Sequence, residues 1–129
     1  MDEIIVKTSK GLPDIEIKSG QANLTSFAID IWDVGTQSWV KVGDDTDNST
    51  KFTLPGPIDD LNHRTLRWTV ILDSLTHQPH DSYDVTVGVS QQGTDVSGSP
   101  KRYADEFKLG QDGKPRQKQI QEQVEVIVQ

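Results

Sequence analysis

Apolar and polar residues alternate along most of this chain, a pattern typical of β-strands with one buried and one exposed face. The alternation is clearest in the segments 15–17, 25–32, 64–73, 83–89 and 120–128. Gly, Pro, Asp, Asn and Ser separate these segments, and helical periodicity is scarce. The pattern predicts an all-β fold of eight or nine strands, arranged as an antiparallel β-sandwich of immunoglobulin-like or jelly-roll-like type. The 129 residues fit a single domain spanning 1–129.

The segment from Ala28 to Gly43 predicts a β-hairpin with a defined register. Gly35 and Thr36 are expected at the centre of a two-residue type II′ turn, which favours Gly at its first position. Trp32 then faces Trp39, and the pairs Ile31–Val40, Asp30–Lys41 and Ile29–Val42 follow. One face of the hairpin is aliphatic and is expected to point inward. The other face carries the Trp pair beside a cross-strand Asp30–Lys41 pair.

The second half of the chain predicts further strands. Leu66, Trp68, Val70 and Leu72 alternate as inward residues of the strand 64–73, so Trp68 is expected to be structural. The strand 83–89 is expected to be its antiparallel neighbour. The Gly- and Ser-rich segment 91–100 is interpreted as a mobile connection. The next segment predicts either a strand through Phe107 and Leu109, which we favour, or a short helix starting at Ser99 and Pro100.

Composition and charge narrow the possible partners. The formal net charge is −7, of which −6 lies in residues 1–60, and this disfavours nucleic acid and anionic membrane surfaces as partners. The segment 101–118 is locally basic, with a net charge of +3. The chain has no cysteine, no apolar run long enough for a membrane helix and no signal-peptide pattern at its start. These features leave the location unknown but favour the cytoplasm over secretion.

The Trp32 and Trp39 pair is the strongest candidate for a binding site. Because aliphatic residues fill the inward face of the hairpin, both indoles are expected on the opposite face, beside Asp30 and Lys41. Flat aromatic rings suit sugar rings and also anchor protein interfaces. Burial by a loop or by a second subunit is the alternative explanation of the pair.

An acidic loop offers a candidate metal site. Asp44, Asp45, Asp47 and Asn48 provide closely spaced oxygen ligands of the kind that calcium prefers. Their spacing does not match the calcium-loop pattern, and Asp and Asn are also common in ordinary turns. The sequence therefore predicts no cofactor, with calcium at this loop as the alternative.

Nothing in the sequence predicts catalysis. The nucleophile elbow, the zinc-protease motif, the phosphate-binding loop and the dinucleotide fingerprint are all absent. The sequence is best interpreted as a non-catalytic binding module that recognises a glycan or a protein surface through the Trp32/Trp39 face. The alternative is a structural or assembly subunit that acts through a homo- or hetero-oligomer interface on that face or on the C-terminal strand. An enzyme is a distant third.

Overall fold

The computed structural model describes all residues from 1 to 129 and contains ten strands and two short 3-10 helices. The prediction of an all-β fold is confirmed, and the strand count exceeds the predicted eight or nine partly because Thr94 and Asp95 form a two-residue strand. The strands are β1 (Asp2–Val6), β2 (Asp14–Ser19), β3 (Asn23–Asp33), β4 (Ser38–Asp45), β5 (Ser49–Thr53), β6 (Thr65–Asp73), β7 (Ser82–Gln91), β8 (Thr94–Asp95), β9 (Lys101–Glu106) and β10 (Lys118–Val128). The helices are η1 (Thr8–Lys10) and η2 (Ile58–Leu61).

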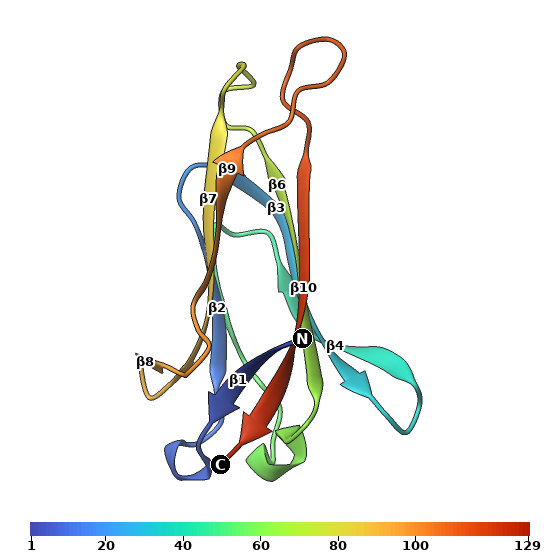
Figure 1. The fold of residues 1–129 in the computed structure, drawn as a ribbon, viewed down its shortest axis with the longest axis vertical. Coiled ribbons are helices and arrows are strands. Elements are labelled where there is room, and N and C mark those ends of the chain that lie inside the picture. Colours follow the sequence, from blue (N-terminus) through green and yellow to red (C-terminus); the bar gives the residue numbers. More distant parts are fainter.

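The strands form two five-stranded sheets (Figure 1). The first sheet has the order β1-β10-β6-β3-β4, and the second has the order β5-β2-β7-β8, with β9 also paired to β7. The predicted pairing of β6 with β7 is wrong, because these strands lie in different sheets and the segment 74–81 crosses between them. The expectation of a wholly antiparallel arrangement is also wrong, since β1 runs parallel to β10.

One hydrophobic core of 23 buried residues lies between the sheets. Alternate residues of β6 and β7 point into it, which matches the predicted inward sets of both strands. Trp68 is 1% exposed, and its indole N–H donates a hydrogen bond to the hydroxyl of Tyr103 on β9, so this tryptophan is structural. No helix of the chain is both long and apolar enough to cross a membrane.

The β3–β4 hairpin has the predicted register near its tip and departs from it further down. Trp32 pairs with Trp39, Ile31 with Val40 and Asp30 with Lys41, as predicted. A β-bulge then places Val42 as an extra residue, so Ile29 pairs with Gly43 instead of Val42. Gly43 has to be glycine-sized here, because a Cβ at this position would lie 2.6 Å from the ring of Phe52.

The predicted type II′ turn is also wrong. Residues 34–37 form the loop, and the positive φ falls on Gln37 (52°) instead of Gly35. The Asp33 carboxylate accepts hydrogen bonds from the backbone N–H groups of Gly35 and Thr36, which holds this alternative turn in place.

The segment after β7 is more ordered than predicted. Instead of a mobile connection, residues 91–100 contain β8, and the carbonyl of Ser97 accepts a hydrogen bond from Ile5 of β1. The strand expected through Phe107 and Leu109 lies earlier, at Lys101–Glu106, and no helix starts at Ser99. The reason is that β9 pairs along β7, which the local alternation of residues could not reveal.

Candidate functional site

The candidate site is the outer face of the first sheet, where the side chains point away from the core. The alternation of each strand places Trp32, Asp30 and Ala28 of β3 on this face, because Ile29 and Ile31 are buried. The strand registers bring neighbouring side chains into line with them. The resulting rows run Glu125–Thr65–Trp32–Trp39, Gln123–Arg67–Asp30–Lys41 and Gln121–Thr69–Ala28–Asp44.

The two tryptophans of the predicted pair do meet. Their ring centroids are 5.2 Å apart at an interplanar angle of 69°, an edge-to-face contact. Both side chains are half-buried, so each keeps part of its surface open to solvent. Together with Thr65 and Gln123 they line a shallow hollow of about 270 Å³. A hollow of this size suits a single small ring better than a whole drug-sized ligand.

Arg67 completes this aromatic cluster, and sequence reasoning did not identify it. Its guanidinium carbon lies 4.1 Å from the ring centroid of Trp39, a stacking distance for a cation–π contact. The contact orients Trp39 and covers part of it. The only signal in the sequence is the outward position of Arg67 between Leu66 and Trp68, which does not say which residue lies beside it.

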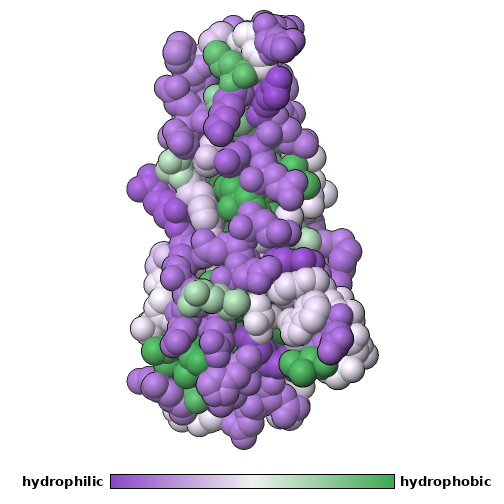
Figure 2. Space-filling model, turned by 45° about the vertical axis from the view of Figure 1, so that its right-hand side comes forward, coloured by the Kyte–Doolittle hydropathy of each residue, from purple (hydrophilic) through white to green (hydrophobic).

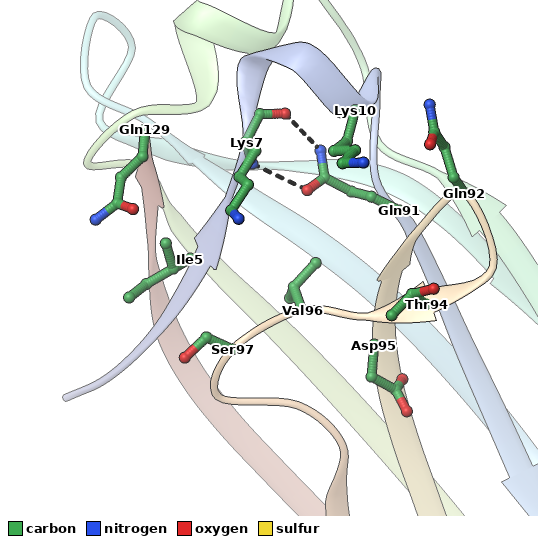
Figure 3. Close-up of a pocket in the computed structure, with 10 residues that line it drawn as sticks. All are labelled: Ile5, Lys7, Lys10, Gln91, Gln92, Thr94, Asp95, Val96, Ser97 and Gln129. Carbon is green, nitrogen blue, oxygen red and sulfur yellow. Dashed lines mark hydrogen bonds between the residues drawn. The ribbon is translucent and has the colours of Figure 1, made fainter.

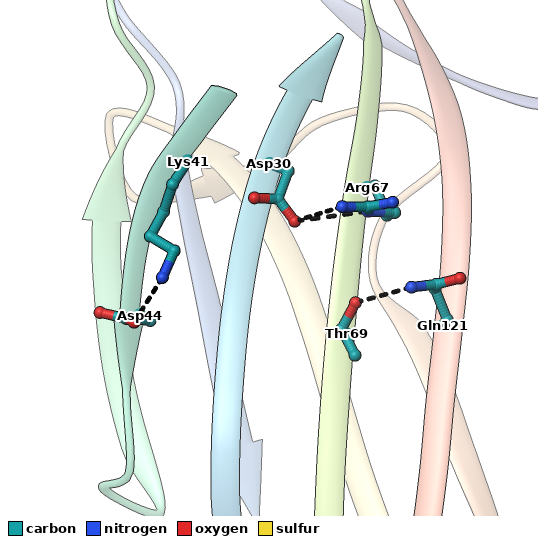
Figure 4. Close-up of polar contacts among 6 residues, drawn as sticks. All are labelled: Asp30, Lys41, Asp44, Arg67, Thr69 and Gln121. Carbon is teal, nitrogen blue, oxygen red and sulfur yellow. Dashed lines mark hydrogen bonds and ion pairs between the residues drawn. The ribbon is translucent and has the colours of Figure 1, made fainter. Parts of the chain in front are cut away.

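The predicted ion pair between Asp30 and Lys41 is wrong, although their backbones are paired (Figure 4). Asp30 instead accepts two hydrogen bonds from Arg67 of β6, at 3.3 Å from Nε and 3.0 Å from the terminal nitrogen. Lys41 turns along its own strand to Asp44, at 2.9 Å, and this contact raises the pKa of Lys41. Arg67 competes better for Asp30 because its planar fork can hold the carboxylate while it stacks on Trp39.

Uncharged hydrogen-bonding side chains lie on β10 and β6 in the rest of the face. Gln119, Gln121 and Gln123 are exposed at alternate positions of β10, and Gln121 donates a hydrogen bond to the Thr69 hydroxyl at 3.0 Å (Figure 4). Ala28 and Ser26 are small, and the half-buried Ile71 lies between Ser26 and Gln119 on the same face. Polar residues dominate the surface in Figure 2, where apolar residues form only small separate patches.

The tip of the β3–β4 hairpin exposes two further apolar residues. Val34 is 70% exposed and Val40 is 45% exposed, so the expectation that Val40 lies on the buried face is wrong. Figure 1 shows the reason: the β3–β4 hairpin extends sideways beyond the second sheet, so nothing there covers its inner face. The tip therefore joins the Trp pair in one projecting, partly apolar element.

The acidic loop keeps its side chains in local contacts. Asp45 accepts hydrogen bonds from the backbone of Thr46 and the hydroxyl of Thr50, which lower its pKa. Asn48 accepts a hydrogen bond from the backbone of Leu24, and Asp44 pairs with Lys41. No group of three or more acidic, histidine or cysteine side chains converges anywhere in the chain in a way that could hold a metal ion. The loop thus has a structural explanation without calcium.

A larger cavity of about 530 Å³ lies at the end of the sheets between β1 and the β7–β8 turn (Figure 3). The buried Gln91 accepts a hydrogen bond from the backbone N–H of Lys7 and donates to the carbonyls of Lys7 and Gly11. All three contacts hold the 7–11 segment against β7, which is a structural role. Lys7, Lys10 and Asp95 line the same cavity, without a converging set of groups that would define a ligand.

No family model matches the chain, and neither the curated proteins nor the solved structures contain a match to it. The interpretation of the site therefore rests on its own geometry and chemistry.

Proposed function

We propose that this protein is a non-catalytic binding module with a β-sandwich fold, which recognises a glycan through the outer face of its first sheet. The observation that carries the proposal is the partly exposed Trp32–Trp39 pair, set beside a shallow hollow. Aromatic side chains present apolar faces to sugar rings, and the amides and hydroxyls around them can donate and accept hydrogen bonds.

The charges of the face favour a neutral glycan over a charged one. Asp30 pairs with Arg67 and Lys41 pairs with Asp44, while Glu125 lies 2.8 Å from His63 at the edge. Because each charge is already paired on the protein, a charged ligand would have to compete with these contacts. Glutamine and threonine side chains remain, and they suit the hydroxyl groups of an uncharged sugar.

The experiment compares the Trp32→Ala/Trp39→Ala double variant with the wild type in affinity electrophoresis. The gels contain a neutral β-glucan, xylan or mannan, or heparin as the charged polysaccharide. We expect at least one neutral polysaccharide to retard the wild type, and the double variant to lose the retardation while keeping its far-UV circular dichroism. Leu75→Ala is the control, since it truncates an exposed apolar residue on the 74–81 loop.

A protein interface on the same element is the second candidate, and the exposed Val34 and Val40 beside the Trp pair favour it. In that case the chain is an assembly subunit. Its sedimentation coefficient should then rise with concentration, and the Val34→Ser/Val40→Ser variant should abolish the rise. Failure of every neutral polysaccharide to retard the folded wild type would reject the glycan proposal.

A further inference from the structure

A second surface, independent of the Trp face, lies where the edges of the two sheets meet at β9 and β10. Strand β1 pairs only with the C-terminal part of β10, from Val124 to Val128. The preceding part of β10, 118–123, has β6 on one side and no strand on the other. Strand β9 likewise pairs only with β7. The upper halves of these two strands face each other in Figure 1, each with one free edge.

The backbone pattern shows which groups are free on β10. Val126 exchanges both of its backbone hydrogen bonds with residues 63 and 64, next to the start of β6. In an antiparallel pair the bonded residues alternate, so the even-numbered residues of β10 face β6. Gln119 and Gln121 therefore direct their N–H and C=O groups away from β6, towards the unpaired side.

The same argument applies to β9. The N–H of Phe107 donates to the carbonyl of Asp81, on the side of β7. The alternation then turns the backbone groups of Arg102, Ala104 and Glu106 away from β7. The Glu106 N–H donates to the Asp105 carboxylate, so Arg102 and Ala104 provide the free amides of this edge. With Gln119 and Gln121 of β10 they border the space between the sheets, and such edges are templates for an added strand.

The space between these edges is a continuous groove. Two adjoining hollows of about 470 and 500 Å³ share Tyr83, Asp105, Lys118 and Gln119 in their walls. Tyr83, Phe107 and Ile120 contribute apolar side chains that are at most 8% exposed, and the rings of Tyr83 and Phe107 lie 5.2 Å apart. The six residues of β9 span about 20 Å at roughly 3.3 Å per residue, enough for about six residues of an extended peptide.

The rim of the groove is basic in a chain whose net charge is −7. Lys108, Arg116 and Lys118 line it and take part in none of the ion pairs of the chain. Arg102 is held by Asp84 at 2.7 Å, and Asp105 and Glu106 are the acidic residues of the walls. The three unpaired cations outnumber the two acids, which favours an acidic occupant.

We propose that this groove binds an extended acidic peptide segment of a partner protein by β-strand addition. The free amides of Gln121 and Ala104 would pair with the peptide backbone, and the apolar floor would receive alternate side chains. The cationic rim would select acidic side chains at the remaining positions. A strand from a second copy of this chain is the competing occupant, which the experiment distinguishes.

The test uses the full ¹⁵N-labelled chain and two blocked heptapeptides, one alternating Glu with Val and the other alternating Lys with Val. The Glu peptide should shift the amide resonances of Ala104, Gln119 and Gln121 in a saturable way, while the Lys peptide should not. The Arg116→Glu/Lys118→Glu variant should bind the Glu peptide about tenfold more weakly than the wild type. The Lys51→Glu variant, changed on the opposite edge strand β5, should bind the peptide with unchanged affinity.

Ala104→Pro removes one outward N–H at an exposed edge position where proline is tolerated, and Ala104→Ser keeps it. Only the proline variant should lose affinity for the Glu peptide. The proposal is rejected if the Glu peptide causes no shift at millimolar concentration, if both peptides bind alike, or if the shifts map to β4 or β5. It is equally rejected if the groove resonances broaden with protein concentration alone, which would assign the groove to a second copy.

Discussion

Replacing Asp30 by Ala removes the carboxylate that anchors the aromatic cluster on the outer face of the first sheet. Asp30 Oδ2 accepts from two nitrogens of Arg67, and the guanidinium lies 4.1 Å from the ring centroid of Trp39. The loss therefore affects both the stability of the face and the orientation of the indole. Lys41 lies directly opposite Asp30 in the hairpin but pairs with Asp44. Arg67, which contacts Asp30, and Lys41, which does not, thus provide a matched comparison of their coupling to Asp30.

The magnitude follows from the burial of the pair. The side chains of Arg67 and Asp30 are 22% and 13% exposed, between a surface pair and a fully buried one. Exposed pairs contribute about 0.2–1 kcal/mol, and losing one partner of a buried pair costs about 3–5 kcal/mol. We therefore expect Asp30→Ala to lower the free energy of unfolding by about 2 kcal/mol. The coupling energy between Asp30 and Arg67 should be about 1–2 kcal/mol.

Double-mutant cycles in urea denaturation measure these couplings. One cycle combines Asp30→Ala with Arg67→Ala, and the second combines Asp30→Ala with Lys41→Ala. The first cycle should give a coupling energy of about 1–2 kcal/mol, and the second should give a coupling energy below about 0.3 kcal/mol. Tryptophan fluorescence of Asp30→Ala should also change, since Arg67 loses its anchor over Trp39. A larger coupling for Lys41 than for Arg67 would refute the geometry of the face.

Three further predictions follow from other parts of the structure. Gly98→Ala should destabilise the fold by about 3 kcal/mol and speed hydrogen exchange of the Ile5 amide, because a Cβ at φ +90° would overlap the carbonyl oxygen of Glu3. Gly93→Ala, at φ +79° with open space around it, should cost only about 1 kcal/mol in chemical denaturation; equal effects of the two substitutions would contradict the close packing of β1. Hydrogen bonds from Ser74 and Thr76 lower the pKa of Asp81 below its unfolded value, so its contribution to stability is full above about pH 4 and is lost as the pH falls through the folded pKa. Asp81→Asn should therefore flatten the acid limb of the melting temperature against pH, and an unchanged limb would refute this role. Added millimolar calcium should leave the melting temperature unchanged, because Asp44, Asp45 and Asn48 already have partners within the chain; a rise that EDTA reverses would restore the calcium hypothesis.

Most of the strands and much of the core could be predicted from the sequence, because alternation is a local property of each segment. Period-two patterning identified the inward residues of β6 and β7, including the buried Trp68. The contact between Trp32 and Trp39 was also predictable, since a short loop leaves few possible registers for a hairpin. The bulge at Val42 was not, because it depends on how Gly43 packs against Phe52 of another strand.

The sequence by itself thus determined an all-β chain, its main strands and the Trp pair on the outer side of one hairpin. Only the tertiary structure decided which strands are neighbours, and strand order depends on contacts between distant segments that carry no local signal. That order separates β6 from β7 and brings Arg67 beside Asp30. It also places β9 and the 118–123 segment of β10 on opposite sides of a groove, each paired with a strand on one side.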